Sequence, residues 1–154
     1  MIQHVIDPGK GPRFAGPMTD RSSSDWRAFV FWTGFALLLG HEMDAMVRHE
    51  WRLLPGFSAI ADDALARDLF TLAHIPLYAV LIWLAGHTRA VLRTRTQWGI
   101  DLFLVAHGAV HFILSDHRLY EFEPPVETIT VYGAALVGAV HLAVSRRIRV
   151  RQAP

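Results

Sequence analysis

Apolar residues are concentrated in four long stretches, and short polar segments separate them. The stretches cover residues 28–47, 69–86, 97–115 and 126–145. Each is close to the length of about 20 residues that an α-helix needs to cross the ~30 Å hydrocarbon layer of a bilayer. The pattern predicts an all-α protein in which residues 25–154 form a bundle of four transmembrane helices.

Turn and capping residues mark the ends of these stretches. Asp25 is a suitable N-cap for the first span, since its side chain can accept a hydrogen bond from the first helical turn. Pro55-Gly56 and then Asp62-Asp63 predict a loop that leads into a second helix. The basic segment 87–96 is expected to be a loop between the second and third spans. The double proline at 124–125 should end the loop before the fourth span.

Residues 1–24 have a different character from the rest of the chain. They include three prolines, three glycines and no apolar run, which argues against a secretory signal. We expect an extended N-terminal arm that becomes ordered only where a partner covers it.

Composition supports the membrane interpretation. Hydrophobic residues make up 52% of the chain and charged residues 19%, a balance that is unusual for a soluble domain. The net charge is only +1, and no nucleic-acid partner is expected. Because the chain has no cysteine, any bound metal must be held by His, Asp or Glu.

Basic residues favour one side of the four-span arrangement. Cytoplasmic loops of membrane proteins carry an excess of Lys and Arg, and this rule places both termini in the cytoplasm. The basic residues on that side are Lys10, Arg13, Arg21, Arg27, Arg89, Arg93, Arg95, Arg146, Arg147, Arg149 and Arg151. The two loops on the other side carry Glu50, Asp62, Asp63, Asp68, Asp116, Glu121, Glu123 and Glu127, together with Arg48, Arg52, Arg67 and Arg118.

The first span ends in a run of polar residues, GHEMDAMVRHEWR, over residues 40–52. His41 and Asp44 are three positions apart and therefore share a helix face, whereas Glu42 lies about 100° around the helix from His41. The helical rise of ~1.5 Å per residue places His41 roughly 20 Å from the cytoplasmic start of its span.

Histidines in two other spans lie at similar depths. His107 and His111 are four positions apart and stack on one face of the third span. The same rise places them at roughly 14 Å and 20 Å from the cytoplasmic side, and His74 near 20 Å. The sequence therefore predicts a site in the non-cytoplasmic half of the membrane that binds a divalent metal, zinc or iron. The predicted ligands are His41, Asp44, His74, His107 and His111.

Three interpretations of these residues are open at this point. In the first, water activated by the metal hydrolyses a substrate, with Glu42 or Asp44 as the general base. In the second, the polar side chains form a structural network, in which Asp44 pairs with Arg48 four positions later. In the third, the protein is a b-type haem protein, and two of the four histidines are axial ligands.

Other polar and aromatic residues are expected at the surfaces of the membrane. A solvated rim is predicted for His49, Glu50, Asp116, His117, Glu121 and Glu123, and interfacial anchoring for Trp51, Phe57, Tyr120 and Phe122. His141 lies about one turn from the cytoplasmic end of the fourth span, so we expect it to be separate from the predicted site.

The fourth span also carries a stripe of small residues. Ala134, Ala135, Gly138 and Ala139 have the small-xxx-small spacing that allows helices to pack closely in membranes. Such a face, together with the N-terminal arm, is suited to packing against other membrane subunits. The sequence thus offers a further interpretation, a non-enzymatic accessory subunit of a larger membrane complex.

Two short elements resemble those of a known group of proteins. They are HEMDA at 41–45, followed by HEWR at 49–52, and HGAVHF at 107–112. These elements resemble motifs of a family of small bacterial integral membrane proteins of unknown function. The resemblance covers the first and third spans and implies a protein of the bacterial inner membrane, without implying an activity.

Overall fold

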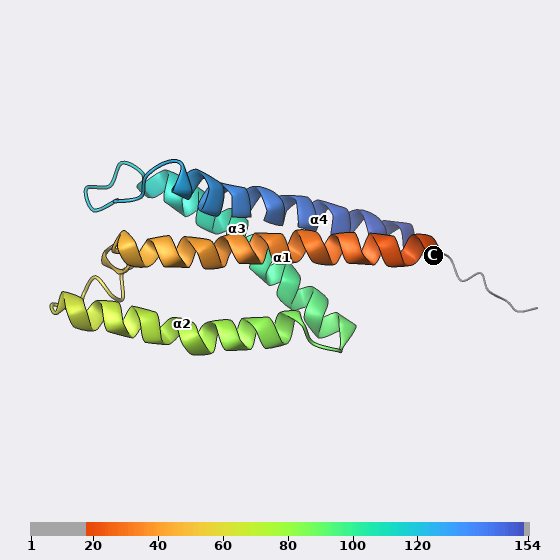
Figure 1. Ribbon diagram of the computed structural model, residues 1–154, viewed down its shortest axis with the longest axis horizontal. Helices are drawn as coiled ribbons and strands as arrows, with labels where there is room; N and C mark the ends of the chain where they lie inside the picture. Colours follow the sequence, from red (N-terminus) through yellow and green to blue (C-terminus); the bar gives the residue numbers. More distant parts are fainter. Residues whose placement is uncertain (1–17, 153–154) are drawn as a thin grey trace, which may run out of the picture.

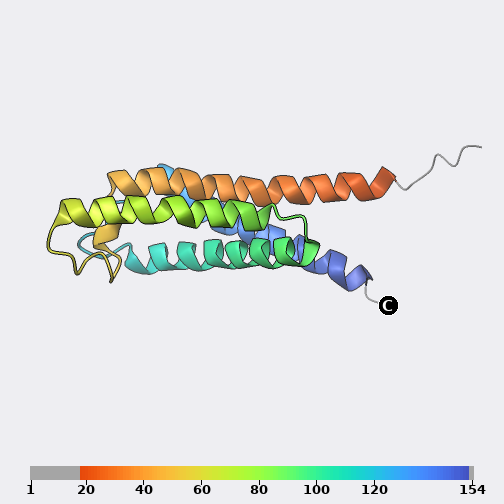
Figure 2. The same cartoon turned by 90° about the horizontal axis from the view of Figure 1, so that it is seen from below.

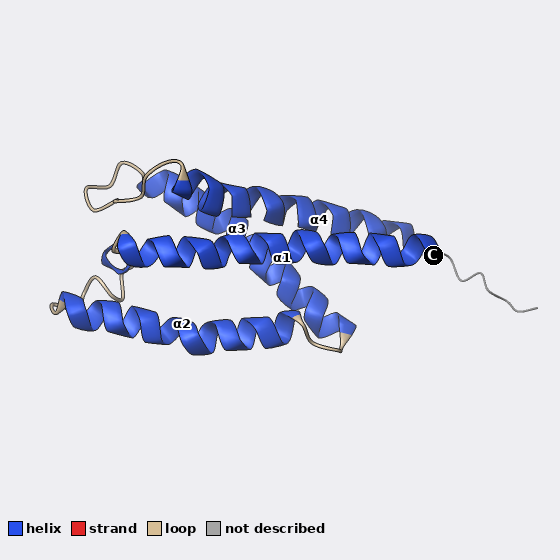
Figure 3. Ribbon diagram, in the orientation of Figure 1, coloured by secondary structure: helices blue, strands red, loops and turns tan. Residues whose placement is uncertain are grey.

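The structure, a computed structural model, describes residues 18–152, and this part of the chain forms helices without any strand (Figure 3). The expected all-α class is therefore confirmed for these residues. In chain order the elements are α1 (Met18–Val47), the 3-10 turn η1 (Glu50–Arg52), α2 (Asp63–Ala85), α3 (Ala90–Leu114), the π-helical turn η2 (Thr128–Tyr132) and α4 (Gly133–Gln152).

The four long helices run alternately in opposite directions between the two ends of the molecule, and α3 crosses behind α1 at an oblique angle (Figures 1 and 2). The start of α1, the connection between α2 and α3 and the end of α4 lie at one end of the bundle. The opposite end carries η1, the loop before α2 and the loop between α3 and η2. Side chains that occur far apart in the sequence can therefore meet at this second end.

The first helix begins earlier than the sequence predicted. α1 starts at Met18 rather than after Asp25, so residues 18–24 are helical and not extended. Neither proline nor glycine occurs between Met18 and Thr33, so no residue there interrupts the helix. The remainder of the expected arm, residues 1–17, lies outside the described residues.

The predicted start of α2 is confirmed, whereas that of α3 is not. The side chain of Asp62 accepts hydrogen bonds from the backbone N–H groups of Ala64 and Leu65 at 3.0 and 3.1 Å, which caps α2. α3 begins at Ala90, inside the segment that was expected to be a loop. The arginine and leucine residues of this segment are good helix formers, and no proline stops them.

Aromatic and aliphatic side chains fill the space between the helices. Phe31 and Phe35 of α1 are buried and stack with ring centroids 6.3 Å apart. The main core consists of Phe31, Phe35, Leu38, Ala85, Ile100, Leu104 and Ala134. A smaller cluster of Trp51, Ala66 and Phe70 packs η1 against α2. Interfacial anchoring was the wrong expectation for Trp51 and Phe122, because both side chains are buried.

Small residues let α3 and α4 approach closely, as the stripe in the fourth span predicted. A Cβ atom added to Gly108 would lie only 2.9 Å from the Cβ of Ala135. One added to Gly138 would lie 3.1 Å from the backbone oxygen of Asp101. Neither position has room for a larger residue without a shift of the backbone.

Among the described residues 18–152, three helical segments are long and apolar enough to cross a membrane, namely Asp63–Ala85, Ala90–Leu114 and Thr128–Arg147. Large apolar side chains are exposed along them, including Leu72, Ile75, Trp83, Phe112, Ile113 and Leu136. This surface is suited to contact with lipid. α1 is not among the three, because its second half carries His41, Glu42 and Asp44.

Candidate metal centre

A left-handed turn at His49 brings Glu50 back toward the end of α1. His49 adopts φ 55° and ψ 40°, a conformation that residues other than glycine rarely adopt. If α1 continued as a helix, Glu50 would lie about 180° around it from His41, nine residues earlier. The turn instead places Oε2 of Glu50 3.3 Å from Nε2 of His41.

Four side chains from three elements converge on one point. His41 of α1, Glu50 of η1, and His107 and His111 of α3 each offer one ligand atom, and these atoms lie within 4.8 Å of one another. Nε2 of His41 is 2.9 Å from Nε2 of His107, and Nε2 of His111 is 3.8 Å from Oε1 of Glu50. Ligands of a tetrahedral zinc ion are about 3.3 Å apart, given the usual metal–ligand distances. The observed spacings bracket this value.

Tyr120 and Glu127 fix the orientation of the His111 ring. The hydroxyl of Tyr120 donates a hydrogen bond to Glu127, and its oxygen lies 2.8 Å from Nδ1 of His111. Because the hydroxyl proton is directed at Glu127, Nδ1 is the donor to Tyr120, and Nε2 of the neutral ring keeps its lone pair. That lone pair belongs to the ligand atom near Glu50. Metal-binding histidines typically have such an orienting partner on their second nitrogen.

The charge states of Glu50 and Tyr120 agree with this arrangement. Burial alone raises the pKa of Glu50, but the neighbouring imidazoles of His111 and His41 outweigh it and hold the pKa below its usual range. Glu50 is therefore an ionised acceptor. Burial and the adjacent Glu127 raise the pKa of Tyr120 well above its ordinary value, so the phenol keeps the proton that it donates.

Three of the four side chains of the centre are buried, and His107 is partly exposed. His41 is 1% exposed and His111 3% exposed. The ring of Phe122 covers both, with centroid distances of 5.4 Å to His41 and 4.8 Å to His111. Nδ1 of His41 is buried without a hydrogen-bond partner. Several acceptor atoms thus converge in a site with little water, an arrangement that a bound cation would stabilise.

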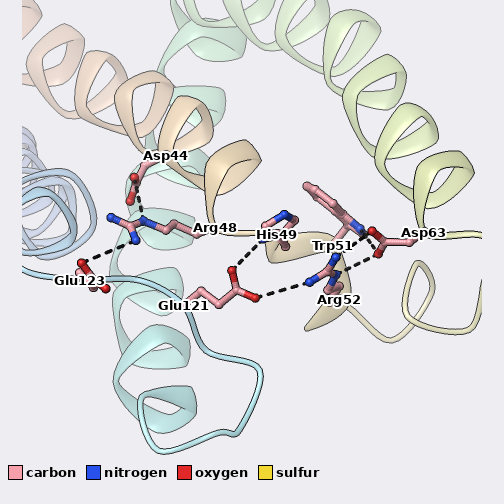
Figure 4. A network of polar contacts seen from close by, with 8 residues as sticks. All are labelled: Asp44, Arg48, His49, Trp51, Arg52, Asp63, Glu121 and Glu123. Carbon is pink, nitrogen blue, oxygen red and sulfur yellow. Dashed lines mark hydrogen bonds and ion pairs between the residues drawn. The ribbon is translucent and has the colours of Figure 1, made fainter.

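Ion pairs hold the loop between α3 and η2 across this end of the bundle (Figure 4). Arg48 lies 3.7 Å from Glu123, and Nδ1 of His49 lies 2.7 Å from Glu121. Arg52 contacts Glu121 at 3.5 Å. The segment that follows α1 therefore fixes the loop that supplies Tyr120 and Phe122 to the centre.

Arg52 also ties this segment to the start of α2. Its guanidinium forms two hydrogen bonds to Asp63, at 2.9 and 2.8 Å, and the indole of Trp51 donates a third to the same carboxylate at 3.0 Å (Figure 4). Asp63 raises the pKa of Arg52, which therefore stays charged. A bidentate pair of this kind fixes orientation as well as distance.

The predicted solvated rim is only partly observed. Asp116, His117 and Glu123 are exposed, and His49 and Glu121 are partly exposed in their mutual ion pair. The expectation was wrong for Glu50, which is 6% exposed. The left-handed turn at His49 is the reason, because it directs the Glu50 side chain into the bundle.

The structure brings together three of the five residues predicted to bind metal, namely His41, His107 and His111. Asp44 faces Arg48 instead, at 3.4 Å. His74 lies near Glu42, with 3.2 Å between Nε2 and Oε2. The two residues predicted as general bases, Glu42 and Asp44, therefore contact His74 and Arg48 respectively, outside the group of four.

Glu50, Tyr120 and Glu127 were not predicted at the site. Helical spacing gave no indication of Glu50, since the backbone turn that positions it breaks the helix. Tyr120 and Glu127 reach His111 from a loop, and loop geometry is not apparent from hydrophobic periodicity. The one sequence signal that points to Glu50 is the second His-Glu pair, at 49–50.

A second buried polar contact lies apart from this centre. Oδ2 of Asp101 in α3 is 2.5 Å from Nδ1 of His141 in α4, and both side chains are buried. Oγ of Ser145 lies 3.4 Å from the other nitrogen of His141. The contact links α3 to α4, and His141 is not one of the four converging residues His41, Glu50, His107 and His111.

Comparison with known proteins gives a family without a known activity. The model of a family of unknown function (DUF6713) matches residues 27–148. No curated protein and no solved structure matches the chain. The match includes all of α2 and α3 and most of α1 and α4, and the expectation of an uncharacterised family is confirmed.

Proposed function

We propose that this chain, which belongs to the family of unknown function DUF6713, is an integral membrane protein that holds one divalent metal ion. The proposed ligands are His41, Glu50, His107 and His111, and the proposed metal is zinc or iron. Nitrogen and carboxylate ligands suit both ions, and the chain has no thiolate to offer.

The convergence of four possible ligand atoms is the observation that carries this proposal. Nε2 of His111 keeps its lone pair because Nδ1 donates to Tyr120, and Glu50 is ionised. Together with the imidazoles of His41 and His107, these atoms meet within 4.8 Å. A cation between them would satisfy all four ligand atoms at once, whereas without a cation Nε2 of His41 and Nε2 of His107 form a hydrogen bond with each other.

The same distances favour a single metal ion over haem. Two axial histidines bind haem iron from opposite sides, so their ligating nitrogens are separated by about 4 Å, twice a usual metal–nitrogen distance. Nε2 of His41 and Nε2 of His107 are 2.9 Å apart, which leaves no room for a macrocycle between them. The structural network predicted from the sequence accounts for the pair of Asp44 with Arg48. It does not require His41, Glu50, His107 and His111 to converge.

We further propose that α1 is the fourth membrane span and that both termini are cytoplasmic, in a bacterial inner membrane. The start of α1 and the end of α4 lie at the same end of the bundle (Figure 1), as an even number of spans requires. This end carries Arg27, Arg89, Arg93, Arg95, Arg146 and Arg147. The positive-inside rule therefore supports the orientation, with the metal centre near the non-cytoplasmic surface.

Hydrolysis by a metal-activated water, with Glu42 or Asp44 as the base, stays a prediction of the sequence. So does an accessory role in a larger complex, since the arm to which it was assigned lies largely outside the described residues.

The experiment that tests the metal centre compares two carboxylates. Protein purified in detergent should contain about one zinc or iron ion per chain by elemental analysis. Glu50→Gln should lose this metal because it removes a charged ligand, whereas Asp44→Asn should retain it. His107→Ala should lose it as well, and the exposed His117→Ala is the matched control.

Two results would contradict the proposal. Loss of metal from Asp44→Asn with retention in Glu50→Gln would restore the ligand set predicted from sequence. Wild-type protein without stoichiometric metal, and without a gain in Tm from zinc, iron, manganese or copper, would show that the four residues form only a hydrogen-bonded network.

A further inference from the structure

A cavity of about 420 Å³ lies between α1, α2 and α3. This volume is in the range of about 300–1,000 Å³ that is usual for small-molecule sites. The lining is mainly apolar and consists of Leu38, Glu42, His74, Leu77, Tyr78, Leu81, Thr96, Gly99, Ile100 and Phe103. None of these residues belongs to the four proposed metal ligands.

Leu77 and Phe103 show how the cavity is reached. Their side chains are 48% and 49% exposed, and they belong to α2 and α3, two of the segments that are apolar enough to cross a membrane. A molecule dissolved in the bilayer therefore has access to the cavity without passing through water. Its apolar part would contact the leucine, isoleucine and phenylalanine side chains.

The polar groups of the cavity are few and close together. Nε2 of His74 lies 3.2 Å from Oε2 of Glu42, and the hydroxyl of Tyr78 is a hydrogen-bond partner of the same carboxylate. Nδ1 of His74 lies 2.6 Å from the backbone oxygen of Phe70. Because a carbonyl oxygen only accepts, Nδ1 is the donor in this contact.

This hydrogen-bond pattern selects the head group of a ligand. The carboxylate oxygens of Glu42 have lone pairs beyond those directed at His74 and Tyr78, so Glu42 offers an acceptor to a ligand. A hydroxyl group can donate a hydrogen bond to this carboxylate. A carboxylate would be repelled by Glu42, and an ammonium group would carry a charge into an apolar cavity at a greater desolvation cost.

We propose that this cavity binds a membrane-dissolved alcohol, a molecule with one hydroxyl head group on a long apolar body. The hydroxyl lies at Glu42, His74 and Tyr78, and the apolar body lies along α2 and α3. The proposal does not depend on a metal ion at the centre formed by His41, Glu50, His107 and His111.

A photoreactive hexadecanol that carries a diazirine in its chain is a suitable probe. In detergent-purified protein it should label peptides of α2 and α3 that line the cavity, and excess unmodified hexadecanol should suppress the labelling. Hexadecanoic acid with the same diazirine should label these peptides at least about fivefold less, because Glu42 repels its carboxylate.

Gly99→Leu tests the cavity itself. A Cβ atom at Gly99 meets no atom within 4 Å, so the larger side chain can occupy the cavity without a clash. The leucine side chain should fill the space that the probe needs, so labelling should fall at least about fivefold. Glu42→Gln should also reduce labelling, because it replaces the charged acceptor for the hydroxyl group with a neutral amide. Gly56→Leu is the matched control, since Gly56 likewise has open space around it but lies outside the cavity.

Circular dichroism and thermal unfolding in detergent establish that each variant is folded. Equal labelling of wild type and Gly99→Leu, or equal labelling by the alcohol and the acid, would overturn the proposal. Either result would show that the cavity is ordinary lipid-facing surface. Specific labelling in protein that contains no metal would support the alcohol site and contradict only the metal proposal.

Discussion

Tyr120 is the residue through which the loop between α3 and η2 acts on the proposed metal centre. It contacts His111 on one side and Glu127 on the other, and it thereby determines which nitrogen of His111 is free to bind. A hydroxyl in this role increases the basicity of the ligand as well as fixing its ring. The contribution of Tyr120 is therefore measurable as metal affinity.

Tyr120→Phe should lower the affinity for zinc about 10–100-fold, the usual effect of removing an orienting partner from a metal-binding histidine. Chelator competition with metal-free protein in detergent measures this affinity. Tyr78→Phe is the control, because Tyr78 bonds Glu42 rather than a proposed ligand. An unchanged affinity in Tyr120→Phe would show that His111 is oriented without Tyr120.

At the scale of single residues, the sequence predicted the three histidines of the proposed centre but not the side chains that contact them. His41, His107 and His111 are identified by helical spacing and depth, which depend only on the regular geometry of α-helices. Glu50 depends on one left-handed residue, His49, and no periodic pattern predicts such a residue. Asp44 shares a helix face with His41, but Arg48, one turn later, lies close enough to pair with it.

At the scale of elements, the contact between α3 and α4 is the closest-packed feature that the sequence predicted. Gly108 and Ala135 face each other, and Gly138 faces the backbone of Asp101. In membranes, small residues at such positions allow the van der Waals contacts that hold helices together. The buried pair of Asp101 and His141 links the same two helices.

Gly108→Ala should destabilise the bundle by about 1–3 kcal/mol, the usual cost of adding volume to a packed interface. Its new Cβ would lie 2.9 Å from that of Ala135, so one of the helices must shift. Gly99→Ala in the same helix should be neutral or slightly stabilising, because its Cβ meets open space and alanine favours helix. Thermal unfolding in detergent compares the two variants, and equal Tm values would contradict the close contact.

The existence of the helices was predictable from the sequence, whereas two of their starts were not. Apolar runs of about 20 residues identify membrane helices because a helix of that length spans the hydrocarbon layer and satisfies its own backbone hydrogen bonds. Polar helical turns at Met18 and Ala90 extend beyond the apolar runs, and hydrophobicity gives no information about where they begin. The capping side chain of Asp62 did mark the start of α2, since it is a local signal.

At the scale of the whole molecule, the alternating direction of the helices separates two chemically different ends. One end carries the arginines of α3 and α4, and the other carries the proposed metal centre and its ion pairs (Figures 1 and 4). The asymmetry determines which side of the membrane each end should occupy.

Single cysteines at Arg93 and Ala59 test this orientation. In intact cells, a membrane-impermeant thiol reagent should label Ala59→Cys, in the loop before α2, and should not label Arg93→Cys near the start of α3. The chain has no cysteine of its own, so no background labelling arises. Labelling of Arg93→Cys from outside would contradict the arrangement with both termini in the cytoplasm.

The polar second half of α1 has a consequence for how the protein is made. A segment that moves laterally from the translocon into the bilayer must be apolar enough to prefer lipid. One aspartate at the centre of such a segment raises its free energy of insertion by about 2.5–3.5 kcal/mol. α1 carries His41, Glu42 and Asp44, yet it is synthesised before α3, which supplies His107 beside His41. We therefore expect α1 to stay at the translocon until the later helices emerge and cover its polar face. In this protein, the insertion of α1 into the membrane would then occur together with the folding of the bundle rather than before it.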